Sequence, residues 1–408
     1  MSRLLVTPPP LRRQLHTRQL PLCDIESDDI DRWESLARRA AEPNPFFEPA
    51  VVLAAAKYLG ETQTSLLIVE DDDAWRACLP IRAVRLAGVT VALSTWNHLY
   101  CFLGTPLIDA DGIDEAAKSL LEMALETAPS HLFFLESVTV GGPVANALTA
   151  AIRELGLNTV LENTHERALL ERRVSCDYLD SMRSHRRREL NRLGRRLEAE
   201  LGGQLSVTDE AGDEGALDAF LELERSGWKG RGETALGSSP AHTAFFHDVC
   251  HAFAAEGRLQ LLALYAGKRR VAMKCNFSSG EGVFCFKIGY DEDLARFSPG
   301  VQLERENVRV FHEDRDERWQ DSCADPQNGM INGLWPDRRR VATAVLARGG
   351  VRAAVSRRGF TAAEMIRTTK RRRSSARSST SKSDDSARAS EKRHSPSPTP
   401  SPSTHSSP

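Results

Sequence analysis

The chain has 408 residues, of which 41% are hydrophobic and 27% are charged, and its formal net charge is −2. These values are typical of a globular protein with room for two or three domains. No stretch approaches the roughly 18 apolar residues that a membrane-spanning helix needs, and the N-terminal sequence MSRLLVTPPPLRRQ lacks a signal-peptide core. We therefore expect a cytoplasmic protein with no membrane span.

The eight cysteines are scattered along the chain and form no CxxC motif and no cluster with histidine. In a chain of this length they are expected to be reduced, mostly buried small side chains. The sequence therefore predicts no bound metal.

The two ends of the chain differ in composition from its middle. Residues 1–14 contain three consecutive prolines and are expected to form a flexible leader. Residues 349–408 are expected to be disordered, because the last 43 residues contain 14 serines and almost no large apolar side chain. Those 43 residues carry ten Lys or Arg against three Asp or Glu. A basic tail of this kind is expected to be a solubilising extension, and contact with nucleic acid or an anionic membrane is the alternative.

Apolar runs and turn signals in the second half predict a complete α/β unit. Strands are expected at 204–208, 259–265, 271–278, 283–290 and 318–322, and helices at 214–225, 239–257, from 298 onward and near 330. Ser239-Pro240 and Ser298-Pro299 are helix-start signals, with proline at the first helical position. The resulting order (strand, two helices, three strands, helix, strand, helix) is that of the GCN5-related N-acetyltransferase (GNAT) fold.

The first half repeats this order more faintly. Helices are expected at 28–40, 48–59, 113–127 and 142–155, and strands at 65–70, 76–86, 89–103 and 131–137. We therefore predict an α/β protein of two tandem GNAT halves with mixed sheets. The expected domains are an N-terminal half at 15–170, a connecting basic helix within 171–203, and a catalytic half at 204–348.

Five stretches carry a resemblance beyond the order of elements. They are LERSGWKGRGETALG (223–237), FKIGYDEDLARFSPGVQLE (286–304), NPFFEPAVVLAAAKYLG (44–60), HLYCFLGTPLID (98–109) and DSCADPQNGMINGLWPDRR (321–339). Together they resemble the BioF2-like acetyltransferase family over about residues 20–345. The resemblance implies acyl transfer from acetyl-CoA and a link to bacterial cellulose or exopolysaccharide synthesis. That family is similar in fold to the Fem-type aminoacyltransferases.

The segment that joins the third meander strand to its following helix is the candidate anion site. Ser298 is expected to cap the helix, and Gly300 places no Cβ in the path of a ligand. Free amides of Gly300 and Val301 at the positive end of the helix dipole would suit the CoA diphosphate. The alternative is a plain Ser-Pro helix start. The cofactor-binding candidates are Phe297, Ser298, Gly300 and Val301.

The helix after this segment carries two polar residues inside an otherwise apolar arc, Glu304 and Asn307. A partly desolvated carboxylate suits a general base, so Glu304 is a catalytic candidate and Asn307 a substrate-binding one. The alternative is a buried glutamate that a Lys or Arg holds without a catalytic role.

The preceding hairpin supplies two lysines. A turn centred on Gly280-Glu281 would place Lys274 directly opposite Lys287, which is unfavourable unless both reach water or an anion lies between them. We expect Glu304 or an acidic substrate group in that position, with Lys287 as the orienting residue and Lys274 as a substrate contact. Alternation would put these lysines on one face with Asn276 and Cys285, opposite Phe284, Phe286, Ile288 and Tyr290.

Four further residues are candidates. Tyr290 and Asp291 end the strand beside the anion segment, and a tyrosine there could protonate the departing thiolate or serve as a core aromatic. Trp228 and Lys229 follow the first helix of the second half and would either wall a ligand cleft or cap that helix.

The sequence therefore predicts an acyltransferase that uses acyl-CoA, with acetyl-CoA as the expected co-substrate and a small-molecule or saccharide acceptor. Two alternatives stay open: a Fem-like enzyme that uses aminoacyl-tRNA, and a non-catalytic scaffold of an exopolysaccharide system.

Overall fold

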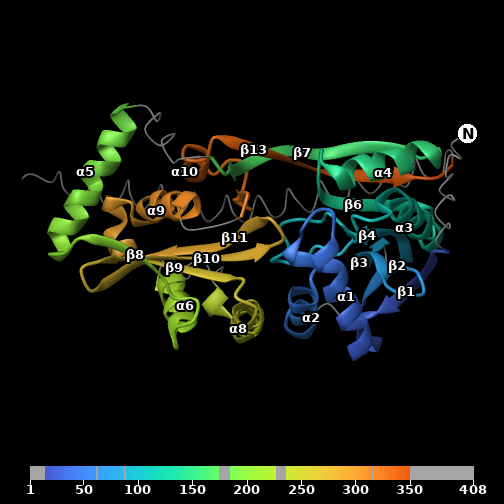
Figure 1. The fold of residues 1–408 in the computed structure, drawn as a ribbon, viewed down its shortest axis with the longest axis horizontal. Coiled ribbons are helices and arrows are strands. Elements are labelled where there is room, and N and C mark those ends of the chain that lie inside the picture. The colour runs from blue at the N-terminus through green and yellow to red at the C-terminus, as the bar shows by residue number, and fades with distance from the viewer. Residues whose placement is uncertain are drawn as a thin grey trace, which may run out of the picture. The chain divides into compact units, whose positions relative to one another are not determined.

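The structure is a computed structural model that describes residues 14–60, 63–86, 89–173, 184–226, 236–313 and 317–349. All of these residues belong to one compact unit (Figure 1). Trp228, Lys229 and nearly all of the predicted tail lie outside the described residues, as does the first part of the predicted connecting helix.

The first half contains a strand, two helices, an antiparallel meander, a helix, a parallel strand and a helix. Its elements are β1 (His16–Pro21), α1 (Ser27–Arg39), α2 (Pro49–Tyr58), β2 (Thr64–Glu70), β3 (Trp75–Leu86), β4 (Val89–Thr95), β5 (Leu107–Ile108), α3 (Ile113–Thr127), β6 (Leu132–Thr139) and α4 (Pro143–Glu154). Strands β1 to β4 pair antiparallel in chain order, and β6 pairs parallel to β4. The strand predicted at 89–103 ends at Thr95, and the chain then enters a loop that later contributes to the site.

The second half repeats this order. Its elements are α5 (Ser184–Leu201), β8 (Leu205–Asp209), α6 (Ala216–Ser226), α8 (Pro240–Ala255), β9 (Leu259–Ala266), β10 (Arg269–Ser279), β11 (Gly282–Tyr290), the 3-10 helix η5 (Glu292–Phe297), α9 (Pro299–Glu313), β12 (Trp319–Asp321) and α10 (Gly329–Asn332). Strands β8 to β11 are antiparallel, and β12 runs parallel to β11. Helices α6 and α8 cover one face of these strands and α9 covers the other (Figure 1). The tandem α/β fold is therefore confirmed.

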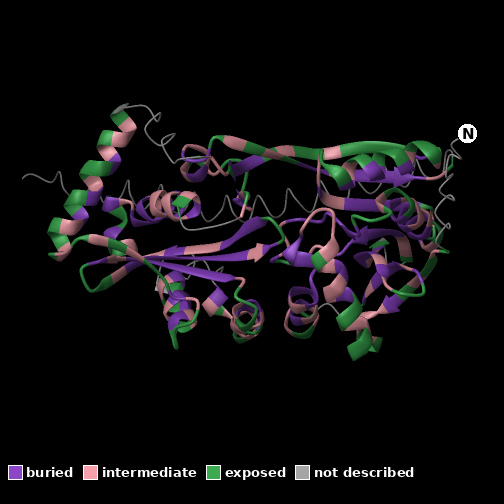
Figure 2. Cartoon of the chain, viewed as in Figure 1, coloured by how far each residue is buried: buried purple, intermediate pink, exposed green. Residues whose placement is uncertain are grey.

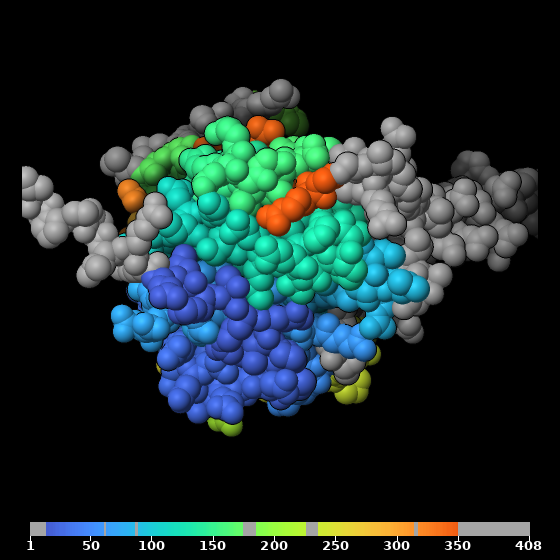
Figure 3. Space-filling view, turned by 90° about the vertical axis from the view of Figure 1, so that its right-hand side faces the viewer, coloured from blue at the N-terminus to red at the C-terminus, as the bar shows by residue number. Residues whose placement is uncertain are grey.

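Two long strands, β7 (Asn158–Glu171) and β13 (Asp337–Ala347), join the halves. The C-terminal strand β13 inserts between β6 and β7 of the first half, and the end of β7 pairs with β12 of the second half. In Figure 3 the orange atoms of β13 lie among the green and teal atoms of the first half. The result is one thirteen-stranded sheet in which each half contributes a strand that pairs with strands of the other half. The first part of β7 is exposed, whereas β9 to β11 are buried (Figure 2).

The hairpin of β10 and β11 departs from the predicted register. Asn276 pairs with Cys285 as expected, but a bulge follows, so that Cys275 pairs with Lys287 and Lys274 with Ile288. The predicted opposition of Lys274 and Lys287 is therefore wrong. An extra residue also reverses the faces beyond it, so Ile288 and Tyr290 pack with the α9-side core, while Phe284 and Phe286 belong to the other core.

No helix among the described residues is both long enough and apolar enough to cross a bilayer.

Candidate active site

Helix α9 begins at Pro299, as the Ser-Pro signal predicts, but Ser298 does not cap it in the usual extended conformation. Ser298 is left-handed (φ 55°, ψ 53°), and its carbonyl accepts hydrogen bonds from the amides of Val301 (3.0 Å) and Gln302 (3.1 Å). The prediction that the Val301 amide is free is therefore wrong. The Gly300 amide has no acceptor among the described residues, so it is the amide that the first turn offers to an anion.

Two guanidinium groups border this segment. Phe297 is 2% exposed and packs in the core, with Arg296 4.5 Å and Arg196 5.7 Å from its ring centroid. Phe297 is thus a support for the segment, and Arg196 comes from α5, the connecting basic helix. Arg296 is ion-paired with Glu200 (2.7 Å), so within this arginine rim Arg196 is the group that favours a phosphate-bearing ligand at the start of α9.

Strand β11 ends beside the same segment with one edge open. Only Gly282–Phe284 pair with β12, at Trp319–Asp321, and from Cys285 to Tyr290 no described strand pairs with that edge. The ring of Tyr290 lies over Gly300, where an added Cβ would stand 3.4 Å from Tyr290 Cδ1. Asp291 turns away from the edge, since its carboxylate accepts from the Asp293 amide (3.0 Å) and pairs with Arg269.

Glu304, Lys274 and Asn307 meet in a buried cluster beneath α9. Both carboxylate oxygens of Glu304 accept from Lys274 Nζ (2.8 and 2.9 Å), and Asn307 Nδ2 donates to Gln320 Oε1 (2.8 Å). Glu304 is 2% and Lys274 1% exposed. The structure therefore matches the alternative given above, in which a lysine holds a buried glutamate. Neither group is open to a substrate, which departs from the predicted roles of Glu304 as base and Lys274 as substrate contact.

Ionisation in this cluster is fixed by its surroundings. Burial disfavours the charge on Lys274, but the Glu304 carboxylate and the hydrogen bonds of Lys274 to Cys285 and Glu304 outweigh burial and raise the pKa of Lys274. Burial raises the pKa of Cys285 to about 12, against the opposing effect of Lys274. The lysine is therefore charged and the thiol protonated near neutral pH, and Cys285 is unsuited to act as a nucleophile.

Lys287 lies on the opposite face of the sheet, because the bulge turns it there. Its Nζ is 5.1 Å from the ring centroid of Tyr100, which comes from the loop after β4 in the first half. Tyr100 Oη lies 3.0 Å from Nδ1 of His242 near the start of α8. The site thus combines Lys287, which the sequence predicted, with Tyr100 and His242, which it did not. The stretch HLYCFLGTPLID, singled out above by resemblance, was the signal for Tyr100.

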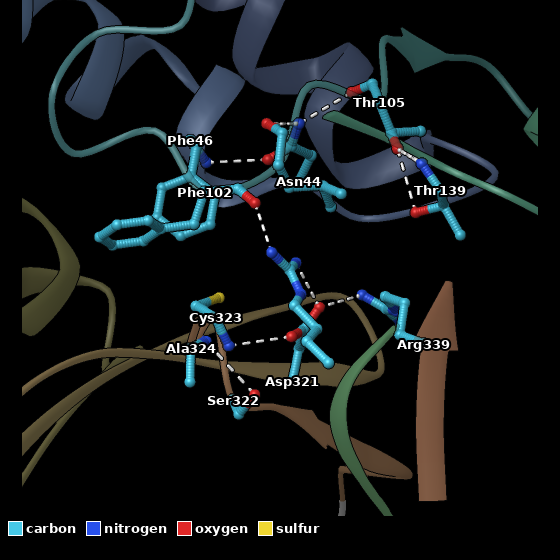
Figure 4. Close-up of polar contacts among 12 residues, drawn as sticks. Asn44, Phe46, Phe102, Thr105, Thr139, Asp321, Ser322, Cys323, Ala324 and Arg339 are labelled. Atoms are coloured by element: carbon cyan, nitrogen blue, oxygen red, sulfur yellow. Dashed lines mark hydrogen bonds and ion pairs between the residues drawn. The ribbon is translucent and has the colours of Figure 1, made fainter. Parts of the chain in front are cut away.

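The loop that carries Tyr100 is held at several points (Figure 4). Asn44 Nδ2 donates to the carbonyls of Leu103 (3.1 Å) and Thr105 (2.8 Å), and Arg167 donates to the carbonyl of Phe102 (2.5 Å). Gly104 allows a close approach, since a Cβ there would stand 1.9 Å from the Glu136 carbonyl oxygen. The loop is therefore anchored in the first half while it presents Tyr100 to the second.

Asp321 completes this support from the second half. It is fully buried at the end of β12 and accepts from Arg167 (2.6 Å), Arg339 (2.7 Å) and the Cys323 amide (3.0 Å) (Figure 4). Burial alone would raise the pKa of Asp321, but the two guanidinium groups and the amide lower it overall. Among the described residues no group of three or more His, Cys, Asp or Glu side chains could hold a metal ion.

Residues 184–328 match the family model described as acetyltransferase (GNAT) domain, a match that spans the anion segment and β11. No curated protein matches the chain.

Several solved structures are similar to the chain over most of its length. One is a conserved protein of unknown function from Bacteroides thetaiotaomicron (TM-score 0.51, 12% identity, 80% of this chain and 98% of that one). Another is the C-terminal domain of a protein assigned as a lysylphosphatidylglycerol synthetase from Agrobacterium fabrum (TM-score 0.51, 12% identity, 82% and 96%). A third is FemX (TM-score 0.50, 10% identity, 78% and 95%). At such identities the likeness shows the fold alone, which is a GNAT-like α/β fold in agreement with the family model.

Proposed function

We propose that the second half is the catalytic half of an acyltransferase that takes an acyl group, first of all acetyl, from acyl-CoA. The acceptor is an amine or hydroxyl of a small molecule or saccharide. The observation that carries this proposal is the open edge of β11, which ends at Tyr290 beside the Gly300 amide and the arginine rim. An acyl-CoA donor also argues for the cytoplasm as the site of action.

The geometry suits the successive parts of CoA, from the diphosphate through the pantetheine arm to the thiol. The diphosphate would bind at Gly300 and Arg196, and Ser298 would shape that turn through its left-handed backbone. The two amides of the pantetheine arm would pair with the open edge of β11 like an added strand. Tyr290 is half-buried at the end of this edge and is the residue we propose to protonate the departing thiolate.

The corresponding helix of the first half argues against a second CoA site. Helix α3 carries Asp114 and Glu115 in its first turn, whereas the first turn of α9 has no acidic residue. Acidic side chains at a helix start compete with an anionic ligand for the same amides and repel it. We therefore propose that the first half is a degenerate copy that shapes the acceptor side.

The proposal is tested by calorimetric titration of the wild type and three variants with acetyl-CoA. Gly300→Asp should weaken binding at least about tenfold, because it adds a negative charge at the diphosphate position. Gly300→Ala, which adds the same Cβ without the charge, should lose much less. Gly329→Asp is the control for a new charge at an exposed helix start, since Gly329 begins helix α10 in open space whereas Gly300 is buried. Equal affinities for Gly300→Asp and wild type would refute the anion site.

A Fem-like reaction with aminoacyl-tRNA as donor is a second candidate. It is favoured by the exposed arginines of α5, Arg188, Arg195 and Arg196, of which Arg196 lies over the Phe297 ring of the anion segment. Titration with tRNA should then give an affinity that falls steeply with salt, which acetyl-CoA binding would not show to the same degree. A non-catalytic scaffold would bind neither ligand. On resemblance alone, we propose an acceptor from cellulose or exopolysaccharide synthesis.

A further inference from the structure

Among the contacts between the two halves is a polar side-chain contact inside an aromatic cluster. Tyr100 is 3% exposed, stacks on Phe245 of α8 (centroids 5.1 Å apart, 16° between planes) and meets Phe286 of β11 edge-on. Its hydroxyl reaches His242 Nδ1 at 3.0 Å, and the two rings are perpendicular. A phenol held this firmly fixes the orientation of the imidazole.

His242 is the member of the pair that a substrate can reach. It is half-buried, and its Nε2 has no partner among the described residues. When one ring nitrogen of a histidine carries the proton in a hydrogen bond, the other is left with a free lone pair. If Nδ1–H donates to Tyr100 Oη, then Nε2 is the basic nitrogen and faces away from the tyrosine.

We propose that His242 is the proton acceptor for the incoming nucleophile, and that Tyr100, supplied by the first half, is the positioning residue that fixes its tautomer. This rests on the proposed acyl transfer. The amine or hydroxyl of the acceptor attacks the thioester carbonyl carbon, and a C–N or C–O bond forms as the C–S bond breaks. With the thioester at the open edge of β11, the proton of the nucleophile passes to His242 Nε2 on the α8 side of that edge, and the thiolate takes a proton from water or from Tyr290 on the α9 side.

The charged neighbours of the pair are consistent with this arrangement. Lys287 of β11 stands over the Tyr100 ring, and Glu224 of α6 is close enough to act on it electrostatically. Burial, and then Glu224, raise the pKa of Tyr100, so the phenol stays neutral and can accept from Nδ1–H. His98 of the same loop is buried beside Phe245.

Two measurements test the proposal. Side-chain ¹⁵N NMR of the wild type should show neutral His242 with the proton on Nδ1, and Tyr100→Phe should lose that preference. A wild-type His242 with the proton on Nε2 would overturn the proposal whatever the acceptor is. The second measurement is release of CoA thiol from acetyl-CoA, with water, primary amines and amino sugars as acceptors.

In that assay His242→Asn should lower kcat by about 100-fold or more, with KM for acetyl-CoA nearly unchanged and the acidic limb of the pH profile lost. Tyr100→Phe should lower kcat less and shift that limb. His247→Asn, on the next turn of α8 and paired with Asp218, is the control and should behave as wild type. A His242→Asn enzyme within about threefold of wild type would overturn the proposal. A wild type that binds no acetyl-CoA in calorimetry would instead defeat the proposed function.

Discussion

The ionisable residues of the second half occupy two kinds of environment. Lys274 and Glu304 form a buried ion pair below α9. This pair holds the helix against the sheet. Lys287, Tyr290 and His242 are half-buried on β11 and α8, where the proposed ligands would reach them. Exposure rather than residue type therefore separates the supporting groups from the candidate reacting ones.

The buried side chain of His98 predicts how the stability of the protein depends on pH. Its Nδ1 accepts from the Tyr100 amide (3.3 Å), and burial lowers the pKa of His98 to about 3, so the folded protein holds it neutral. In the unfolded chain the ordinary value is about 6.5. Between these pKa values the unfolded state binds the extra proton, so stability falls as the pH falls below about 6.5. The contribution approaches about 1.4 kcal/mol per pH unit.

His98→Asn should remove this dependence while it keeps an acceptor for the Tyr100 amide. Urea unfolding at pH 6, 5 and 4 should therefore show a shallower decline of the unfolding free energy for the variant than for the wild type. Parallel declines would mean that His98 becomes protonated, or exposed, in the folded protein.

At the scale of elements, the sequence predicts what depends on neighbours in the chain. The Ser-Pro starts of α8 and α9 and the meander of β9 to β11 lie where apolar periodicity and proline place them. The bulge in β10 and β11 could not be predicted in this way, because residues 285–290 alternate regularly and nothing local marks an extra residue. The bulge matters for the site because it moves Lys287 to the face of the sheet that contacts Tyr100.

The sequence does not predict strands β7 and β13, for a related reason. Each finds its partners in the other half of the chain, and residues 158–166 of β7 are largely exposed, so the amphipathic pattern that usually reveals a strand is weak. Tyr100 and His242 were missed likewise, because their contact spans 142 positions in the sequence.

The exchange of β13 predicts the effect of truncation. A chain that ends at residue 336 lacks the strand between β6 and β7, so each of these strands would lose the hydrogen-bonded partner on that side. The apolar side chains of β13, including Val341, Val345 and Leu346, would also be missing from the core. We expect such a chain to unfold at a much lower temperature or to aggregate. Thermal unfolding followed by circular dichroism measures this, with a chain that ends at Gly349 as the control. Equal melting temperatures would show that β13 is dispensable.

At the scale of the whole molecule, the seam between the halves contains both buried and exposed ion pairs. Arg167 and Asp321 are almost fully buried, whereas Lys57 of α2 and Asp248 of α8 are exposed. Buried pairs become costly when one partner is removed, and exposed pairs contribute little. The shared strands and this seam together imply that the halves unfold as one cooperative unit.

Asp321→Asn tests this cooperativity. The substitution leaves the guanidinium groups of Arg167 and Arg339 facing a neutral amide, and Arg167 is 4% exposed, so the unfolding free energy should drop by about 3–5 kcal/mol. Urea unfolding followed by tryptophan fluorescence and by circular dichroism should give a single transition with one midpoint, at lower urea than wild type by both probes. Asp248→Asn also removes a contact between the halves, from Lys57 and Tyr58, but at the surface, and should cost at most about 1 kcal/mol. Two separate transitions in Asp321→Asn would show that each half is stable alone, and Tyr100 would then have to be held in place by its own half.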